Sequence, residues 1–191
     1  MSASPVARLT LDDYLAIDHA SDRPLEFHDG EIYPMVATTV DHSIIATNTT
    51  HHLANRLDGS NCRVAAAIRI RATAKNVVYP DIAVFCGSIL RAQDAPDSAI
   101  NPKLIVEVLS PSTEGYDHSE KFDIYCQLPT FEEYVLIAQD QPRVHVFHKK
   151  SDIQWTLTKY DGLQSNIKLE SLGIELAASD IFSGVEFLPP S

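Results

Sequence analysis

The first sixty residues carry apolar positions at helical spacing, interrupted by one strong turn signal. Apolar residues follow Thr10 at intervals typical of a helix, and the Thr10 side chain is suited to cap that helix. A second apolar face extends from a cap at Asp41 to about Leu57. Between these segments, Asp29-Gly30 separates two short apolar runs, which is the strongest short-range signal of a β-hairpin. The predicted order is therefore helix, hairpin, helix.

Apolar runs of strand length dominate the rest of the chain. Residues 62–73 alternate between apolar and polar side chains, as a half-exposed strand does, whereas residues 77–85 are β-branched and aromatic. Pro80 lies within the second run and favours an edge strand or a bulge. Further strands are predicted at residues 104–109, 133–138, 143–148, 153–160 and 167–169. Two further helices are predicted, at residues 116–128 and near residues 177–182.

This order of elements predicts a mixed α/β (α+β) domain with one central β-sheet flanked by helices. The chain has 191 residues and no obvious linker, repeat or low-complexity stretch. We therefore assign residues 1–191 to a single domain, in which the N-terminal helix and hairpin pack on the core. A composition of 45% hydrophobic and 21% charged residues is ordinary for a globular protein.

The charge balance is acidic and limits the partners to be expected. Asp and Glu number 26 against 15 Lys and Arg, which gives a net charge of -11. General attraction to nucleic acid or to an anionic membrane is therefore not expected, and a nucleic-acid partner would require a local basic patch or bound metal ions. No apolar run is long enough for a transmembrane helix, so no membrane association is predicted.

Cysteine usage and the N-terminus indicate a cytoplasmic protein. The N-terminal residues lack the hydrophobic core of a signal peptide. The three cysteines are far apart and form no CxxC motif, so the sequence predicts neither a disulfide framework nor a zinc knuckle. A reducing cytoplasm is the simplest location. The cysteines are Cys62, Cys86 and Cys126.

The most informative position is a carboxylate inside an apolar strand. Glu107 stands in the run LIVEVL, where an isolated charge is costly and either takes up a proton or finds a partner. One interpretation is that Glu107 lies on an exposed face, or pairs with Lys103 or an arginine. The other is that Glu107 binds a cation together with Asp81, which also lies between hydrophobic residues, in VVYPDIAVF. Mg²⁺ suits such a site, because it binds through one or two carboxylates plus water and substrate phosphate.

A lysine follows these acids at a useful distance. Asp117 and Lys121 are four residues apart and therefore fall on one face of the predicted helix. One interpretation is a surface salt bridge, which contributes little to stability. The other is that Lys121 orients a water molecule and stabilises negative charge in a transition state.

Taken together, these residues resemble the Uma-two family of restriction-endonuclease-like proteins, a branch of the PD-(D/E)XK nuclease superfamily. The resemblance rests on Pro80-Asp81, on Glu107 in LIVEVLSPST, and on Asp117 and Lys121 in YDHSEK. It covers most of the chain. It implies a restriction-endonuclease-like core in which a central mixed sheet is flanked by helices.

The resemblance also implies roles for individual residues. Asp81, Glu107 and Lys121 correspond to the catalytic residues, and Asp81, Glu107 and Val108 correspond to the metal-binding positions. The implied metal is Mg²⁺, which Mn²⁺ can replace. In the superfamily the lysine usually stands two residues after the acid, where this chain has Leu109. In this family it is supplied by the following helix, which matches Lys121.

Five further residues are candidates for supporting the site or contacting substrate. Three interpretations are open for Glu26: an extra metal ligand, a residue that holds a water molecule, or a surface acid of the hairpin. Three are open for His42 as well: it could contact a phosphate, form a hydrogen bond with Glu26, or have only a structural role. Ser110 and Thr113 follow Glu107, and the first-turn amides of the next helix could accept a phosphate, but plain capping is the preferred interpretation of each hydroxyl. Asp117 is the fifth candidate.

These observations predict a metal-dependent endonuclease that hydrolyses phosphodiester bonds in DNA. Asp81 and Glu107 would hold Mg²⁺, and Lys121 would assist the attacking water. Two alternatives stay open: a catalytically inactive nuclease-fold module for interaction or dimerisation, and a metal-dependent hydrolase of a small phosphoester, which suits an acidic surface better. DNA is the candidate partner, a homodimer through the strands after residue 133 is expected, and no small-molecule organic cofactor is expected.

Overall fold

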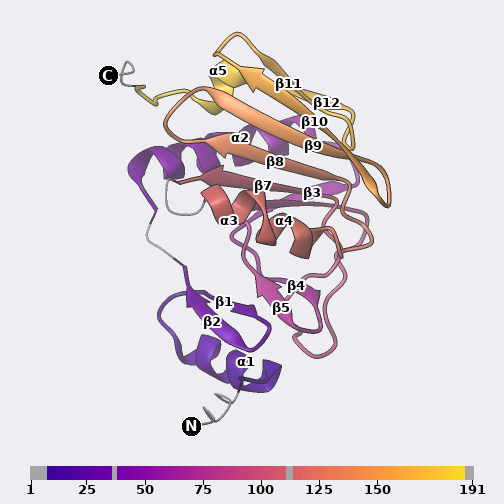
Figure 1. Cartoon of the computed structure of the whole chain (residues 1–191). Helices are drawn as coiled ribbons and strands as arrows, with labels where there is room; N and C mark the ends of the chain where they lie inside the picture. The colour runs from indigo at the N-terminus through magenta and orange to yellow at the C-terminus, as the bar shows by residue number, and fades with distance from the viewer. Residues whose placement is uncertain (1–7, 36–37, 111–113, 188–191) are drawn as a thin grey trace.

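The computed structural model of the chain describes residues 8–35, 38–110 and 114–187. A six-stranded mixed sheet lies at its centre (Figure 1). Its strands are β3 (Cys62–Ala66), β6 (Ile82–Cys86), β7 (Leu104–Leu109), β8 (Glu133–Ala138), β9 (Arg143–Ser151) and β10 (Gln154–Asp161). Their order in the sheet is β10-β9-β8-β7-β6-β3, and only the pair β7–β8 is parallel within the described part of the chain.

In the described residues, two smaller sheets and five helices surround this centre. A four-stranded sheet in the order β2-β1-β5-β4 contains β1 (Leu25–His28), β2 (Glu31–Pro34), β4 (Ile70–Thr73) and β5 (Asn76–Val78). A hairpin near the C-terminus pairs β11 (Asn166–Leu169) with β12 (Ile174–Ala177). The helices are α1 (Leu11–Ala20), α2 (Val40–Arg56), α3 (Glu114–His118), α4 (Glu120–Tyr125) and α5 (Ala178–Ile181). None of the described helices is long and apolar enough to span a membrane.

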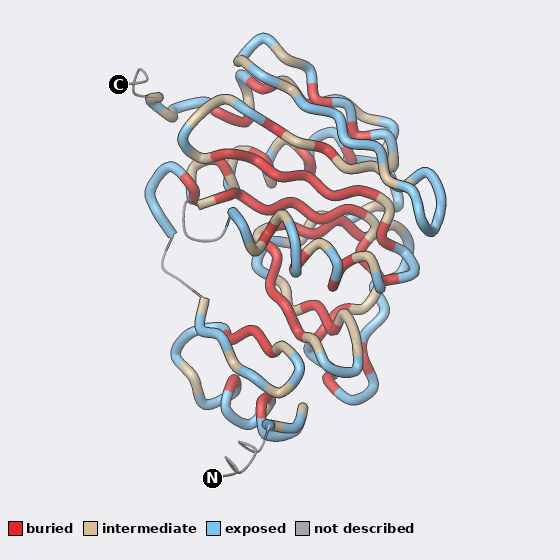
Figure 2. The backbone as a smooth tube through the Cα atoms, in the orientation of Figure 1, coloured by how far each residue is buried: buried red, intermediate tan, exposed pale blue. Residues whose placement is uncertain are grey.

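Helices cover both faces of the central sheet (Figure 1). On one face, Leu53 of α2 packs in the same core cluster as Val106 of β7. On the other face, Tyr125 of α4 packs in a second cluster with Ile105. Successive side chains of a strand point to opposite faces, so Glu107 shares the face of Ile105 and lies beneath α3 and α4. Strand β7 is buried along its whole length, and the same is true of β8 (Figure 2).

Helix α1 packs on the first hairpin. The Thr10 side chain caps α1 as predicted, by accepting a hydrogen bond from the Asp13 amide at 3.2 Å. The ring of Tyr14 stacks on Phe27 with 5.1 Å between the ring centroids, and its hydroxyl donates to the Leu25 carbonyl at 2.8 Å. The hairpin turns at Asp29-Gly30, which confirms that prediction. Strand β1 then pairs with β5, which connects the hairpin to the rest of the fold.

Two predicted helices have different boundaries in the structure. The cap of α2 is Thr39, whose hydroxyl accepts from the His42 amide at 3.1 Å, rather than Asp41. Asp41 instead lies in the first turn, where a negative charge is also favourable. The helix predicted at 116–128 is two short helices, because Ser119 between them has non-helical backbone angles (φ -125°, ψ -90°).

Two predicted strands each divide into two. The run at 62–73 breaks at Ala67, which adopts a left-handed backbone conformation (φ 48°), and its halves β3 and β4 join different sheets. The run at 77–85 breaks at Pro80, which has no N–H to donate to a ladder. Strand β6 follows this proline and lies between β7 and β3, so the predicted edge position is wrong. Strand β12 was not predicted.

A disulfide bond joins Cys62 to Cys86, contrary to the prediction from the cysteine spacing. The two residues lie directly opposite each other on the antiparallel strands β3 and β6, with 3.9 Å between their Cα atoms. Their sequence separation of 24 residues concealed this pairing, which depends on strand register. Cys126 is free and partly buried. Disulfides are uncommon in reducing compartments, so this bond does not support the cytoplasmic location. That location stays a prediction.

Candidate active site

Two carboxylates lie side by side where β6 begins next to β7. Ile82 pairs with Val106 in the antiparallel ladder, so Asp81, just before β6, lies beside Glu107. The Asp81 amide donates to Glu107 Oε2 at 3.3 Å, and the Val108 amide donates to Asp81 Oδ2 at 2.7 Å. Each carboxylate is therefore held by a main-chain amide of the other strand. The main chain of Val108, rather than its side chain, faces Asp81, because that side chain belongs to the core on the opposite face.

Glu107 is buried and paired. It is 3% exposed, so the interpretation as a solvated strand residue is wrong. It is not paired with Lys103 either, whose ammonium instead lies 2.6 Å from Glu132. The Oε1 atom of Glu107 accepts from the Tyr125 hydroxyl at 2.8 Å and lies 3.0 Å from Lys121 Nζ. The acid in the apolar strand thus has specific partners from α4.

Lys121 is the positive centre of this cluster. Its Nζ lies 3.0 Å from Glu107 Oε1, 3.2 Å from Glu26 Oε1 and 3.8 Å from Asp117 Oδ1. Lys121 and Asp117 are 6% and 4% exposed, so their pairing is not a surface salt bridge. Helix α4 therefore directs the lysine at Glu107, as the resemblance requires.

Glu26 is an inner residue of the cluster rather than a surface acid of the hairpin. It is 7% exposed, and its Oε1 accepts from the Tyr79 amide at 2.9 Å. Its Oε2 lies 3.3 Å from His28 Nε2 and accepts from the Tyr116 hydroxyl at 3.4 Å. The ammonium of Lys121 thus bridges Glu26 of the N-terminal hairpin and the central sheet.

The other three supporting candidates have different outcomes. His42 does not bond Glu26; its Nε2 lies 3.2 Å from Asp81 Oδ2. Ser110 lines the same cavity as Asp81, and its carbonyl accepts the first amide hydrogen bond of α3 at 2.9 Å. Thr113, predicted as a cap or phosphate contact, lies outside the described residues.

Burial and mutual attraction set the protonation of the cluster. Burial raises the pKa of Glu107 well above its usual range, and the positive charge of Lys121 only partly offsets this. Burial alone would also raise the pKa of Glu26, but Lys121 and hydrogen bonds lower it to about 2. Burial opposes the charge of Lys121, yet Glu107 and Glu26 raise its pKa well above the usual range. Lys121 is therefore a cation at neutral pH and Glu26 is ionised, while Glu107 takes up a proton more readily than an ordinary glutamate.

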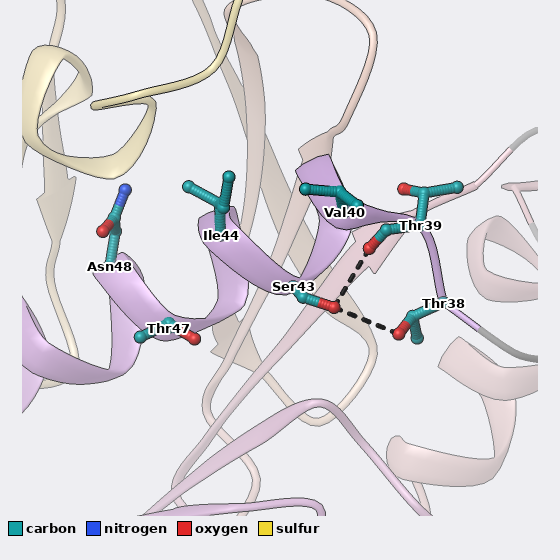
Figure 3. A pocket seen from close by; sticks show the side chains of 7 residues that line it. All are labelled: Thr38, Thr39, Val40, Ser43, Ile44, Thr47 and Asn48. Carbon is teal, nitrogen blue, oxygen red and sulfur yellow. Dashed lines mark hydrogen bonds between the residues drawn. The ribbon is translucent and has the colours of Figure 1, made fainter.

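These side chains line one cavity of about 720 Å³. Its described lining residues include these candidates: Glu26, His42, Asp81, Glu107, Val108, Ser110, Asp117 and Lys121. A second cavity of about 420 Å³ lies along the first turns of α2 (Figure 3). Its lining residues in the described part of the chain include no ionisable side chain: Thr38, Thr39, Val40, Ser43, Ile44, Thr47 and Asn48. The first cavity is therefore the candidate active site.

The donor atoms of this cavity fit a hard divalent cation. Asp81 and Glu107 supply carboxylate oxygens on adjacent strands, which Mg²⁺ and Mn²⁺ both accept. Within the described residues, no group of three or more His, Cys, Asp or Glu forms a protein-only metal cage. Mg²⁺ does not need one, because water and substrate phosphate complete its coordination.

Four residues that support the cluster were not predicted from the sequence: His28, Tyr79, Tyr116 and Tyr125. One of them was accessible from the pattern. His28 stands two residues after Glu26, which places both on one face of a strand. Tyr79 contributes its main-chain amide, which no side-chain pattern reveals, and the tyrosines of α3 and α4 carry no local signal.

A mixed sheet with these acids at adjacent strands and helices on both faces defines a restriction-endonuclease-like fold. A solved structure shares it: the crystal structure of "a putative nuclease belonging to DUF820" from Anabaena variabilis. The two superpose with a TM-score of 0.75 over 92% of this chain and 98% of that chain, at 20% identity.

The family follows from the sequence comparison. The model of the Uma2 family, described as "Putative restriction endonuclease", matches residues 11–179, so the chain belongs to this family and the predicted resemblance is confirmed. Two similar proteins of Synechocystis sp. are each 30% identical to it and are named as uncharacterized. The protein slr1290 aligns over 97% of both chains, and sll1609 aligns over 87% of this chain and 95% of its own.

Proposed function

We propose that the chain is a metal-dependent nuclease that hydrolyses phosphodiester bonds at the cavity of Asp81, Glu107 and Lys121. The observation that carries this proposal is the position of Lys121, whose Nζ lies 3.0 Å from Glu107 Oε1 although the two residues come from different elements. A short motif could arise by chance, whereas Glu107 and Lys121 are buried charged groups, and their convergence with Asp81 on one cavity is costly to maintain without a function.

Each residue has a role that its surroundings support. Asp81 and Glu107 would hold Mg²⁺, which lowers the pKa of bound water and stabilises charge on phosphate when present. Lys121 stays protonated, because two carboxylates raise its pKa. It therefore orients water and stabilises negative charge as a cation, and does not act as a general base. Glu26 keeps Lys121 in place from the hairpin side.

The inactive-module alternative is less well supported by this arrangement. A decayed site usually loses one of its groups, whereas Asp81, Glu107 and Lys121 are all present and all line one cavity. The tight pairing of Glu107 with Lys121 is also compatible with a purely structural ion pair. Metal binding therefore has to be measured separately from cleavage.

The experiment measures Mn²⁺ binding and Mg²⁺-dependent cleavage for the same set of variants. Wild-type protein is compared with Glu107→Gln and Asp81→Asn by calorimetric titration of Mn²⁺ and by cleavage of plasmid and single-stranded DNA. We expect both substitutions to lower cleavage by about 100-fold or more and to weaken Mn²⁺ binding. The matched control is Glu132→Gln, because Glu132 is a partly exposed acid outside the cavity, paired with Lys103.

The outcomes separate the alternatives. Cleavage that survives in Glu107→Gln would refute this site. Neither cleavage nor Mn²⁺ binding by the wild type would support the inactive module. Cleavage of a small phosphodiester without cleavage of any DNA would support the small-phosphoester hydrolase.

We also expect a homodimer. Strand β10 forms one edge of the central sheet. Leu157 of β10 is 42% exposed, and Ile153, in the turn just before β10, is 97% exposed. Unpaired strand edges with apolar side chains are typical pairing surfaces. A strict monomer at micromolar concentration in light scattering would contradict this expectation.

A further inference from the structure

Three aromatic side chains form a row along one wall of the active-site cavity: Tyr33 of β2, His28 of β1 and Tyr116 of α3. The ring centroids of Tyr33 and His28 are 5.2 Å apart, and those of His28 and Tyr116 are 5.6 Å apart. At the inner end, Lys121 Nζ lies 5.8 Å from the Tyr116 ring centroid. At the outer end, Tyr33 is 48% exposed. This aromatic row therefore leads from the proposed catalytic lysine to the surface.

The row is fixed before any ligand arrives. The Tyr116 hydroxyl lies 2.9 Å from His28 Nε2, and His28 is also 3.3 Å from Glu26. The Tyr33 hydroxyl donates to Glu31 on the same strand. A large exposed ring held in this way presents a flat apolar face at little further cost in conformational freedom.

The charges of the cavity do not suit an extended double-stranded backbone. Among its described lining residues, five are acids and only Lys121 is a lysine or arginine. Duplex binding draws its affinity mainly from lysines and arginines that neutralise successive phosphates. This cavity offers one, so a ligand must gain affinity from other contacts, and aromatic side chains provide such contacts by stacking on unpaired bases.

The depth of the site also favours a ligand with unpaired bases. The reacting groups are almost completely buried, with Glu107 3% and Lys121 6% exposed. The cavity volume of about 720 Å³ lies in the range typical of small-molecule and nucleotide pockets. A base in a duplex is already stacked and paired and cannot also lie on Tyr33, whereas an unpaired nucleotide can.

We propose that this site takes an unpaired nucleic-acid strand, with one or more bases stacked on Tyr33 while the phosphate approaches Lys121. This inference rests on the proposed nuclease function and adds the substrate class. It predicts that binding tolerates any base sequence, because every base has a face that can stack. It also predicts a shallow salt dependence, near the slope of about -0.7 expected for one neutralised phosphate on a single strand.

The experiment measures binding separately from cleavage. Fluorescence anisotropy compares a labelled ten-nucleotide single strand with a blunt duplex of the same length, in Ca²⁺, which occupies carboxylate sites and supports little phosphodiester cleavage in general. We expect the single strand to bind at least 10-fold more tightly. Tyr33→Leu should weaken single-strand binding by roughly 5- to 100-fold, the loss of one stacked base. Tyr33→Phe keeps the ring and should stay within about 2-fold.

Matched controls keep the test decisive. Leu90→Ala removes an apolar side chain of similar exposure (53%) from the loop between β6 and β7, outside the cavity, and should leave binding unchanged. Thermal unfolding checks that each variant is folded, which is expected because Tyr33 is half exposed. Equal affinity for the duplex, unchanged binding by Tyr33→Leu, or no binding of either nucleic acid would overturn this inference. Metal-dependent duplex cleavage abolished in Glu107→Gln would at the same time leave the proposed nuclease function standing.

Discussion

Replacing Lys121 by methionine should destabilise the fold strongly at neutral pH and less strongly in acid. Methionine fills nearly the same space without the charge. The substitution would leave Glu26, Glu107 and Asp117 buried around an apolar side chain, and the first two lie 3.2 and 3.0 Å from the missing ammonium. Removing one partner of a buried ion pair typically costs about 3–5 kcal/mol.

The pKa of Glu26 gives an independent magnitude. It is lowered from 4.5 to about 2, and Lys121 is the largest cause that acts in this direction. That difference corresponds to roughly 3 kcal/mol of stability. Because the folded pKa lies below the unfolded one, this stability is fully present above about pH 4.5 and is lost as the pH falls toward 2. In the variant the buried acids gain protons instead. The difference in unfolding free energy between wild type and variant should therefore become smaller as the pH falls.

Urea unfolding in EDTA, followed by the fluorescence of Trp155, measures this difference in unfolding free energy at pH 7.5 and at pH 4. We expect Lys121→Met to cost about 3–5 kcal/mol at pH 7.5 and clearly less at pH 4. The control is Lys103→Met, since Lys103 pairs with Glu132 at 2.6 Å but is partly exposed, and should cost under about 1 kcal/mol. Equal losses for the two variants at pH 7.5, or a loss at Lys121 that grows in acid, would refute the reasoning.

Three further predictions concern stability elsewhere in the fold. Reducing the bond between Cys62 and Cys86 should cost roughly 3 kcal/mol, because it constrains 24 residues of the unfolded chain; a urea midpoint unaffected by dithiothreitol would contradict this. Thr10→Ala should cost about 1 kcal/mol by removing the cap of α1, and Thr10→Ser, which keeps the hydroxyl, should restore most of the loss in the same assay. Glu133→Gln should cost about 1–3 kcal/mol, since an amide nitrogen would replace the oxygen that accepts two hydrogen bonds from Ser171; wild-type stability in this variant would argue against that geometry.

Local patterns in the sequence were sufficient where the signal is carried by neighbouring residues. The cap at Thr10 and the Asp29-Gly30 turn are confirmed, because both depend on backbone geometry within a few residues. The run at 77–85 shows the limit of such patterns. Its apolar residues indicate a strand, but Pro80 divides it between two different sheets, and pairing partners are set by the whole fold.

The sequence predicts which residues form the candidate site better than it predicts which of them contact one another. The unusual acids Asp81 and Glu107 stand out because charge is rare in apolar strands. Lys121 and Glu26 are 95 positions apart in the chain. His42 lies on α2, whereas Asp81 comes just before β6. Such long-range contacts depend on strand order, which the sequence pattern does not specify.

The acidity of the cavity has a consequence for the order of binding. Five lining acids face one lysine, and that lysine already lies against Glu26 and Glu107. A phosphate that entered this cavity alone would meet uncompensated negative charge at low effective dielectric, where repulsion is strong. A divalent cation at Asp81 and Glu107 would reduce this repulsion and would also displace the proton that Glu107 holds readily because of its raised pKa. We therefore expect the affinity for phosphate to depend on the bound metal, and the affinity for the metal to increase with pH. Both properties follow from the buried carboxylate of Glu107.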